Sequence, residues 1–198
     1  LTMSMTGIGM WRTDPNPVGG ISFAPNPYCY RCPLGKTYPE CDLACANAVE
    51  DIIKTNTSGK VAAFFAEPIQ GNAGIITPPG YFQRLKEILD KYNILLVVDE
   101  VQTGFGRTGK MFAIENFNIV PDIMTVAKAL GNGTPISAFI ATAQIADSYI
   151  KPGASTLGGN PVSSTAALAT LDYIDSENLI SKATERGQQL FNGLKTLQ

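Results

Sequence analysis

A carboxylate and an amine each follow a short apolar run near the middle of the chain. Asp99 comes directly after the run 94–98, and Lys128 comes directly after the run 123–127. Runs of this length and composition are typical of buried strands. Open α/β sheets bind ligands beyond the carboxyl ends of their strands, so both side chains are predicted to lie at that edge. Taken alone, Asp99 could equally cap the next segment, and Lys128 could be a solvated loop lysine.

An aspartate beside a lysine is the pair that pyridoxal phosphate requires. The lysine forms a Schiff base with the cofactor, and the aspartate keeps the pyridinium nitrogen protonated. Glycine-bearing segments at 104–109 and 131–133 follow the two residues, so each is predicted to precede a turn or loop.

Strand-like and helical patterns alternate through the chain. Apolar runs that predict strands lie at 61–66, 94–98, 123–127 and 136–141. Helical spacing or helix-opening prolines predict helices at 42–56, 81–92, 111–117 and 161–175, and from residue 179 onward. This alternation predicts an α/β fold with a mostly parallel sheet flanked by helices.

Local composition refines three of these elements. Residues 1–40 are rich in proline, glycine and aromatic side chains, which predicts an irregular connection with short strands. The continuous run 61–66 predicts a strand covered on both faces. In the helix 81–92, the spacing predicts that four side chains point inward: Phe82, Leu85, Ile88 and Leu89.

The overall composition excludes several classes of protein. With 44% apolar and 16% charged residues, the chain is typical of a well-buried globular protein and not of a disordered one. A net charge of −2 gives no basic surface for nucleic acid. No run is long enough to span a membrane, and residues 1–5 do not resemble a signal peptide, so we expect a cytoplasmic protein. The absence of histidine removes Ser-His and Cys-His pairs and histidine metal sites.

The four cysteines are clustered as Cys29-x2-Cys32-x8-Cys41-x3-Cys45. A CxxC followed by a CxxxC can bind zinc or an iron–sulfur cluster, although the second spacing departs from the usual zinc patterns. The alternative is an ordered, tyrosine-rich excursion, residues 26–46, with reduced thiols. Two disulfides are a third option, which a cytosolic setting disfavours.

Four ordered blocks of sequence resemble the class III aminotransferases, pyridoxal phosphate enzymes of fold type I. They are FAEPIQG at 65–71, VDEVQTGFGRTG at 98–109, PDIMTVAKALGNG at 121–133 and TLGGNP at 156–161. The resemblance runs from 61 to 198 and extends to residues 2–7, which resemble the segment after a tyrosine-histidine-glycine motif absent here. The family that the chain resembles includes 4-aminobutyrate, alanine–glyoxylate and acetylornithine transaminases.

The resemblance implies a role for each matching residue. Lys128 would be the Schiff-base lysine, and Asp99 would face the pyridine nitrogen. Val101 would pack on the cofactor ring. Its alternative is an ordinary core residue, which requires almost the same apolar packing. Gln102 would donate to the phenolic oxygen of the cofactor; otherwise it is an ordinary polar loop residue.

Two further residues have weaker implied roles. Thr156 resembles the threonine that reaches the cofactor phosphate of the neighbouring subunit, which implies a homodimer or a dimer of dimers. Its alternative is to start the turn at 158–159. Glu67 resembles an acid near the substrate pocket, and its alternative is to cap the strand end before Pro68.

The resemblance also implies a domain organisation. Residues 1–175 would be part of the large cofactor-binding domain, and 176–198 a helix leading toward a C-terminal small domain. The chain starts at Leu1 and ends inside a helical pattern, so we expect a piece of a longer polypeptide. The phosphate-cradling glycine-serine motif and the ring-stacking aromatic would precede it, and the substrate-carboxylate arginine would follow it.

The function implied is transfer of an amino group from an amino acid or ω-amino donor to a keto acid or aldehyde acceptor. An amino-acid racemase or epimerase on the same scaffold would share every residue named. A catalytically incomplete fragment is another alternative, and a binding module stapled by metal at the cysteines is a rival from a different class.

Overall fold

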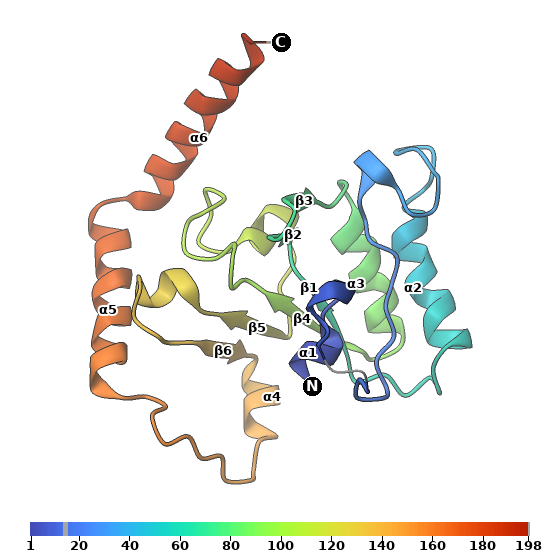
Figure 1. Cartoon of the computed structure of the whole chain (residues 1–198), viewed down its shortest axis with the longest axis horizontal. Helices are drawn as coiled ribbons and strands as arrows, with labels where there is room; N and C mark the ends of the chain where they lie inside the picture. Colours follow the sequence, from blue (N-terminus) through green and yellow to red (C-terminus); the bar gives the residue numbers. More distant parts are fainter. Residues whose placement is uncertain (14–15, 198) are drawn as a thin grey trace.

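A four-stranded sheet forms the centre of the computed structural model, which describes residues 1–13 and 16–197 (Figure 1). Its strands are β1 (Ala63–Ala66), β4 (Leu95–Asp99), β5 (Ile123–Val126) and β6 (Ala138–Ala141), in the order β1-β4-β5-β6. β1, β4 and β5 are parallel, and β6 runs antiparallel to β5. The predicted mostly parallel sheet is confirmed. The short segment 127–137 explains the exception, because a parallel return needs a longer crossover.

The remaining elements surround this sheet. The helices are α1 (Thr2–Met5), α2 (Ala44–Thr55), α3 (Tyr81–Lys91), α4 (Ala143–Asp147), α5 (Pro161–Ser176) and α6 (Leu179–Lys195). The 3-10 turns are η1 (Gly9–Trp11), η2 (Cys29–Arg31), η3 (Ala113–Phe117) and η4 (Lys128–Gly131). A small hairpin consists of β2 (Ile69–Gln70) and β3 (Ile75–Ile76).

Several local predictions differ from the structure. The short strands predicted within 1–40 are wrong for the described part, 1–13 and 16–40, which contains only α1, η1 and η2; positions 14–15 and 198 lie outside the described residues. Prolines explain this, since they remove backbone donors. The predicted helix 111–117 is the 3-10 turn η3. The hairpin and α4 were missed because such short elements leave no detectable period.

The main core lies between α2, α3 and the sheet. The predicted inward side chains of α3 are all buried: Phe82, Leu85, Ile88 and Leu89. They pack with Leu96 and Val98 of β4 and with Val49 and Ile53 of α2. At about 1.5–3 kcal/mol for each fully buried large apolar side chain, this cluster is the main stabilising feature of the chain.

An ionic contact fixes α2 on α3. The Glu50 carboxylate accepts hydrogen bonds from Lys91 Nζ and the Tyr92 hydroxyl, both at 2.7 Å, and lies 3.0 Å from Lys54 Nζ. Lys91, Tyr92 and Lys54, in that order, lower the pKa of Glu50 to about 2. The contact therefore holds the end of α3, from which the chain enters β4, in register with α2.

The two faces of the sheet differ in how they are covered. Strand residues alternate between faces, so Leu96 and Val98 face the main core while Val97 and Asp99 face the other way. The register places Phe65 beside Val97, and the side chain of Phe65 is 53% exposed. The prediction that the run 61–66 is covered on both faces is therefore wrong for this chain. The face that carries Asp99 is thus open at Phe65 of β1 but covered at Val97 of β4, which is buried.

A second, smaller core joins α5 to the end of β5. Met124 and Val126 pack there with Leu130 of η4 and Ala167 of α5. α6 contacts α5 and then extends away from the rest of the chain (Figure 1). None of the described helices is long and apolar enough to cross a membrane.

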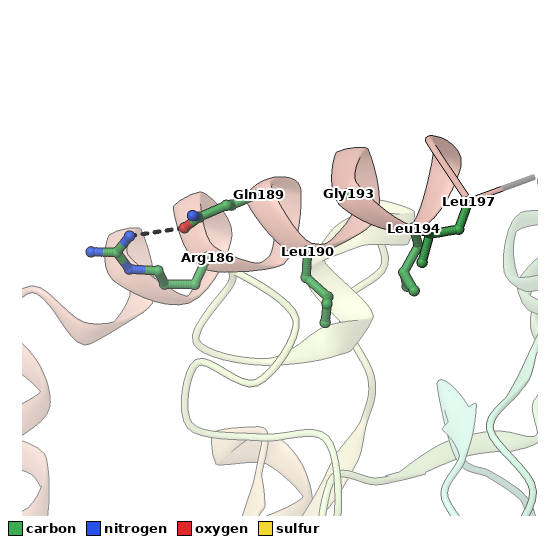
Figure 2. Close-up of a pocket in the computed structure, with 6 residues that line it drawn as sticks. All are labelled: Arg186, Gln189, Leu190, Gly193, Leu194 and Leu197. Carbon is green, nitrogen blue, oxygen red and sulfur yellow. Dashed lines mark hydrogen bonds between the residues drawn. The ribbon is translucent and has the colours of Figure 1, made fainter.

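A shallow hollow on the described surface lies along α6. It has a volume of about 500 Å³ and is lined only by residues from 186 to 197. Figure 2 shows Leu190, Leu194 and Leu197 on one side of the helix. Because α6 and Leu197, just beyond its end, supply the whole lining, this hollow is an uncovered apolar helix face and not a built ligand site.

Candidate active site at the carboxyl ends of β4 and β5

Asp99 and Lys128 lie at the same edge of the sheet. β4 and β5 are parallel neighbours, and the register pairs Asp99 with Thr125. Lys128 opens η4 directly after β5 and Ala127. The prediction that an acid and an amine follow adjacent parallel strands is therefore confirmed. Their roles toward a cofactor stay predictions.

One oxygen of Asp99 is used locally. Asp99 Oδ1 accepts a hydrogen bond from the backbone N–H of Val101 at 2.9 Å, which is the capping role considered for it. A carboxylate has two oxygens and about four acceptor positions, so capping leaves capacity for a cationic donor. The side chain is half-buried at the end of β4. Capping and cofactor binding are compatible here.

Lys128 has an unusual backbone. Its φ is +43°, in the left-handed region that L-residues other than asparagine and aspartate rarely adopt. A conformation of this kind costs about 1–3 kcal/mol and persists only where the surroundings enforce it. The surroundings are buried: Leu130 belongs to the second core, and a Cβ on Gly131 would lie 2.7 Å from Ile136 Cγ2. The packing of Leu130 and Gly131 thus fixes the turn, while the Lys128 side chain is exposed.

Glu100 is a residue of this region that sequence reasoning missed. It is completely buried. Its carboxylate accepts hydrogen bonds from Ala113 N at 3.1 Å, from Ile114 N at 2.8 Å and from the hydroxyl of Thr103. These bonds tie η3 and the loop 100–112 to the end of β4, and this loop carries Val101 and Gln102.

The signal for Glu100 was present in the sequence. Consecutive strand residues point to opposite faces, so two adjacent acids at a strand end cannot both face one ligand. Once Asp99 is placed at the ligand edge, Glu100 must face inward. A buried carboxylate requires donors, and a loop with exposed N–H groups supplies them.

Gln102 and Glu67 meet at Gly71. An added Cβ on Gly71 would lie 2.3 Å from Gln102 Cδ, so the glutamine side chain lies directly on this glycine. The backbone N–H of Gly71 donates to Glu67 Oε2 at 2.8 Å. Two candidate residues from different blocks of the sequence are thus brought together. The Glu67 bond lies at Gly71, directly after β2, so the alternative that Glu67 caps the strand end before Pro68 stays a prediction.

Val101 and Thr156 are placed differently. Val101 is half-buried at the start of the loop after β4, whereas Thr156 is exposed in the segment before α5. Ser155 bonds to the turn there: its Oγ accepts from Gly158 N at 3.0 Å. The alternative, that Thr156 starts the turn at 158–159, stays a prediction. Within the described residues, no hydrogen bond joins its side chain to Asp99 or Lys128.

The residues at the strand ends fit pyridoxal phosphate by their chemistry. A carboxylate suits a protonated ring nitrogen, an exposed lysine suits an aldehyde, and an amide suits a phenolic oxygen. Asp99, Lys128 and Gln102 supply these groups. A metal is a poorer fit, since no three His, Cys, Asp or Glu side chains in the described part of the chain are grouped to hold one, and the four cysteines are free thiols.

The model of the family described as Aminotransferase class-III matches residues 1–198. This chain belongs to the class III aminotransferase family. The family match covers the four motifs, which lie at 65–71, 98–109, 121–133 and 156–161. The resemblance inferred from those motifs is confirmed.

Three relatives illustrate the range of this family. A leucine/methionine racemase from Thermococcus litoralis is 48% identical over 192 residues, covering 93% of this chain and 42% of that protein. An ornithine aminotransferase from Oceanobacillus iheyensis is 47% identical over 155 residues, covering 76% of this chain and 38% of that protein. The structure of an amine transaminase from an uncultivated Pseudomonas species, in its PLP-bound internal aldimine form, matches with a TM-score of 0.90 and 33% identity. The match covers 98% of this chain and 47% of that chain. This class III chain thus spans less than half the length of each.

Proposed function

We propose that the protein to which this chain belongs is a pyridoxal phosphate-dependent aminotransferase. The observation that carries the proposal is the position of Asp99 and Lys128 at the carboxyl ends of two adjacent parallel strands. Family membership supports it, and so does the likeness to a transaminase structure in its PLP-bound form. The substrates are an amino donor and a keto acid or aldehyde acceptor.

Each residue has a defined task in this proposal. Asp99 holds the protonated ring nitrogen by its charge, with its position fixed by the Val101 N–H. Gln102, whose side chain packs against Gly71, donates to the phenolic oxygen, and Val101 makes an apolar contact with the ring. Glu67, which accepts the Gly71 N–H, contributes to the substrate pocket. When bound, pyridoxal phosphate withdraws electrons from the substrate carbon that bears the amino group.

Lys128 moves the proton. Its Nζ anchors the cofactor at rest and, when the amine of the substrate displaces it, accepts the proton that leaves the substrate carbon. The exposed side chain on a rigid turn lets Nζ move while its Cα stays fixed. If the proton is not returned to the substrate carbon, the amino group is transferred. Its return to that carbon on the opposite side produces the mirror-image amino acid.

Racemisation is the second candidate function, and a specific observation favours it. The Thermococcus racemase is 48% identical over 93% of this chain. The residues named above would serve either reaction, because both begin with removal of the same proton. The difference lies in where the proton is delivered.

One experiment separates the two. The full-length protein is incubated with single enantiomers of α-amino acids and with ω-amino donors, each with and without a keto acid acceptor. We expect a new amino acid to form only when the acceptor is present. Loss of optical activity without an acceptor would instead establish a racemase, and neither reaction across the panel would contradict both proposals.

We also propose the domain and subunit organisation. Residues 1–175 form part of the large cofactor-binding domain, and 176–198 lead toward a small domain, which is supported by the direction of α6 away from the sheet (Figure 1). The active unit is a homodimer in which Thr156 reaches the cofactor phosphate of the partner; its exposed position supports this. Sedimentation of the full-length protein as an active monomer would contradict the dimer.

A further inference from the structure

All four cysteines line one small cavity. Cys29, Cys32, Cys41 and Cys45 surround a space of about 10 Å³, next to Pro78. This is about the volume that one water molecule requires, so the cavity that these residues line is too small for an iron–sulfur cluster. All four are free. The proposed aminotransferase reaction uses none of them.

Cys29 and Cys32 bracket one tight turn. η2 begins at Cys29, and Cys32 is the residue that ends it. Side chains three residues apart in a 3-10 turn lie one above the other, so these two thiols are on the same side of the turn. Cys29 is exposed and Cys32 half-exposed, whereas Cys45 is buried in α2. A reagent in solution therefore has access to the first pair.

The surroundings of the thiols make Cys32 more reactive than Cys29 or Cys45. The backbone N–H groups of Lys36 and Leu34, followed by that of Gly35, lower the pKa of the Cys32 thiol. The Lys36 charge adds to this effect. Burial, followed by the charges of Cys41 and Cys32, raises the pKa of Cys29. The thiolate is the nucleophilic form of cysteine, so Cys32 is set to react first.

Burial separates Cys45 from this chemistry. Its pKa is raised mainly because the thiol is buried, which disfavours the thiolate. Cys41 precedes α2 and is half-buried. Cys45 therefore lacks both the exposure and the stabilised thiolate of Cys32, and Cys41 lies outside the turn that the first pair brackets.

We propose that Cys29 and Cys32 form a reversible dithiol–disulfide site that reacts with low-molecular-weight disulfides. The Cys32 thiolate attacks one sulfur of the small disulfide, its S–S bond breaks, and one small thiolate leaves. The Cys29 thiolate then attacks Cys32 Sγ, the mixed S–S bond breaks, and the second small thiolate leaves. Two protein thiols are oxidised by two electrons, the small disulfide is reduced to two thiols, and the two protein protons pass to those thiols.

The test uses the full-length protein, reduced and then equilibrated with mixtures of reduced and oxidised glutathione. Remaining thiols are blocked with N-ethylmaleimide under denaturing conditions, and the peptides are mapped by mass spectrometry. We expect one bridge, Cys29–Cys32, that dithiothreitol reverses, with Cys41 and Cys45 still blocked by the reagent. Complete blocking of all four thiols at every ratio, or a bridge that involves Cys41 or Cys45, would overturn the proposal.

Serine variants test the order of attack. Cys29→Ser should retain glutathione on Cys32 as a mixed disulfide, because the second thiol is missing. Cys32→Ser should lose the fast reaction, and the matched control Cys41→Ser should keep the bridge. In the native reduced protein, iodoacetamide should modify Cys32 several-fold faster than Cys29. Equal rates, or stoichiometric zinc that protects the thiols, would overturn the assignment.

Discussion

The loop after β4 and the loop before α5 both carry predicted cofactor contacts, yet they are held in very different ways. The first is tied by the buried Glu100, and a Cβ on its Gly104 would lie 2.9 Å from the carbonyl oxygen of Glu100. In the second, Thr156 is exposed and the turn depends on a bond between Ser155 and Gly158. The chain thus organises the contacts that belong to its own sheet and leaves Thr156 in solvent, as expected if that residue serves another subunit.

The largest effect is expected at Lys128, which opens the buried turn η4 after β5. Lys128→Ala in the full-length protein should lower turnover by roughly 10⁴-fold or more, because no other group nearby moves the proton. The visible absorbance of the bound cofactor should change as well. Lys110→Ala, an exposed lysine in the loop after β4, is the matched control and should retain activity. Turnover near the unmodified rate in Lys128→Ala would remove this residue from the site.

Asp99→Asn should have the next largest effect. Asparagine keeps the oxygen that accepts from Val101 N but removes the charge, so activity should fall by about 100-fold or more while the fold survives. The measurement is kcat together with the circular dichroism spectrum. Asp172→Asn, on the exposed side of α5, is the control. If Asp99→Asn loses only a few-fold in kcat, capping is the main task of Asp99.

Glu100→Ala tests the organised loop through stability. It leaves two backbone N–H groups and the Thr103 hydroxyl buried without an acceptor, so the free energy of unfolding should fall by roughly 3–5 kcal/mol. Hydrogen exchange should increase across 100–117. Glu40→Ala removes an exposed carboxylate and should change stability by less than about 0.5 kcal/mol. Equal stability of the two variants would show that Glu100 does not hold the loop.

Thr156→Val tests the loop before α5 and should have the smallest effect on the fold. We expect the free energy of unfolding to change by less than about 0.5 kcal/mol, because the side chain is exposed. Cofactor affinity of the dimer should fall by about tenfold or more through loss of one bond to a charged phosphate. Thr165→Val on α5 serves as control. Unchanged affinity would separate Thr156 from the cofactor.

The sequence was sufficient where one physical signal dominated. The apolar runs before Asp99 and Lys128 located β4 and β5, and the 3.6-residue spacing located α3 and its buried face. The motifs were sufficient to identify the family. Adjacency of the two strands follows from chain order in a parallel sheet, so their common edge was predictable.

Other features depend on packing that no local pattern records. The exposure of Phe65 depends on what covers the sheet, and a continuous apolar run cannot reveal this. The contact of Gln102 with Gly71 joins two loops far apart in the chain. The left-handed backbone of Lys128 was not predicted either, because lysine has no preference for that conformation.

That backbone has a consequence for attempts to make the protein more robust. Glycine at position 128 would relieve the left-handed strain, and a procedure that selects only for resistance to heat would favour the replacement. The same replacement removes the amine. Heat resistance and turnover are therefore opposed at this one position, so a useful library must keep Lys128 fixed and look for its gains elsewhere, on surfaces such as the exposed side of α5.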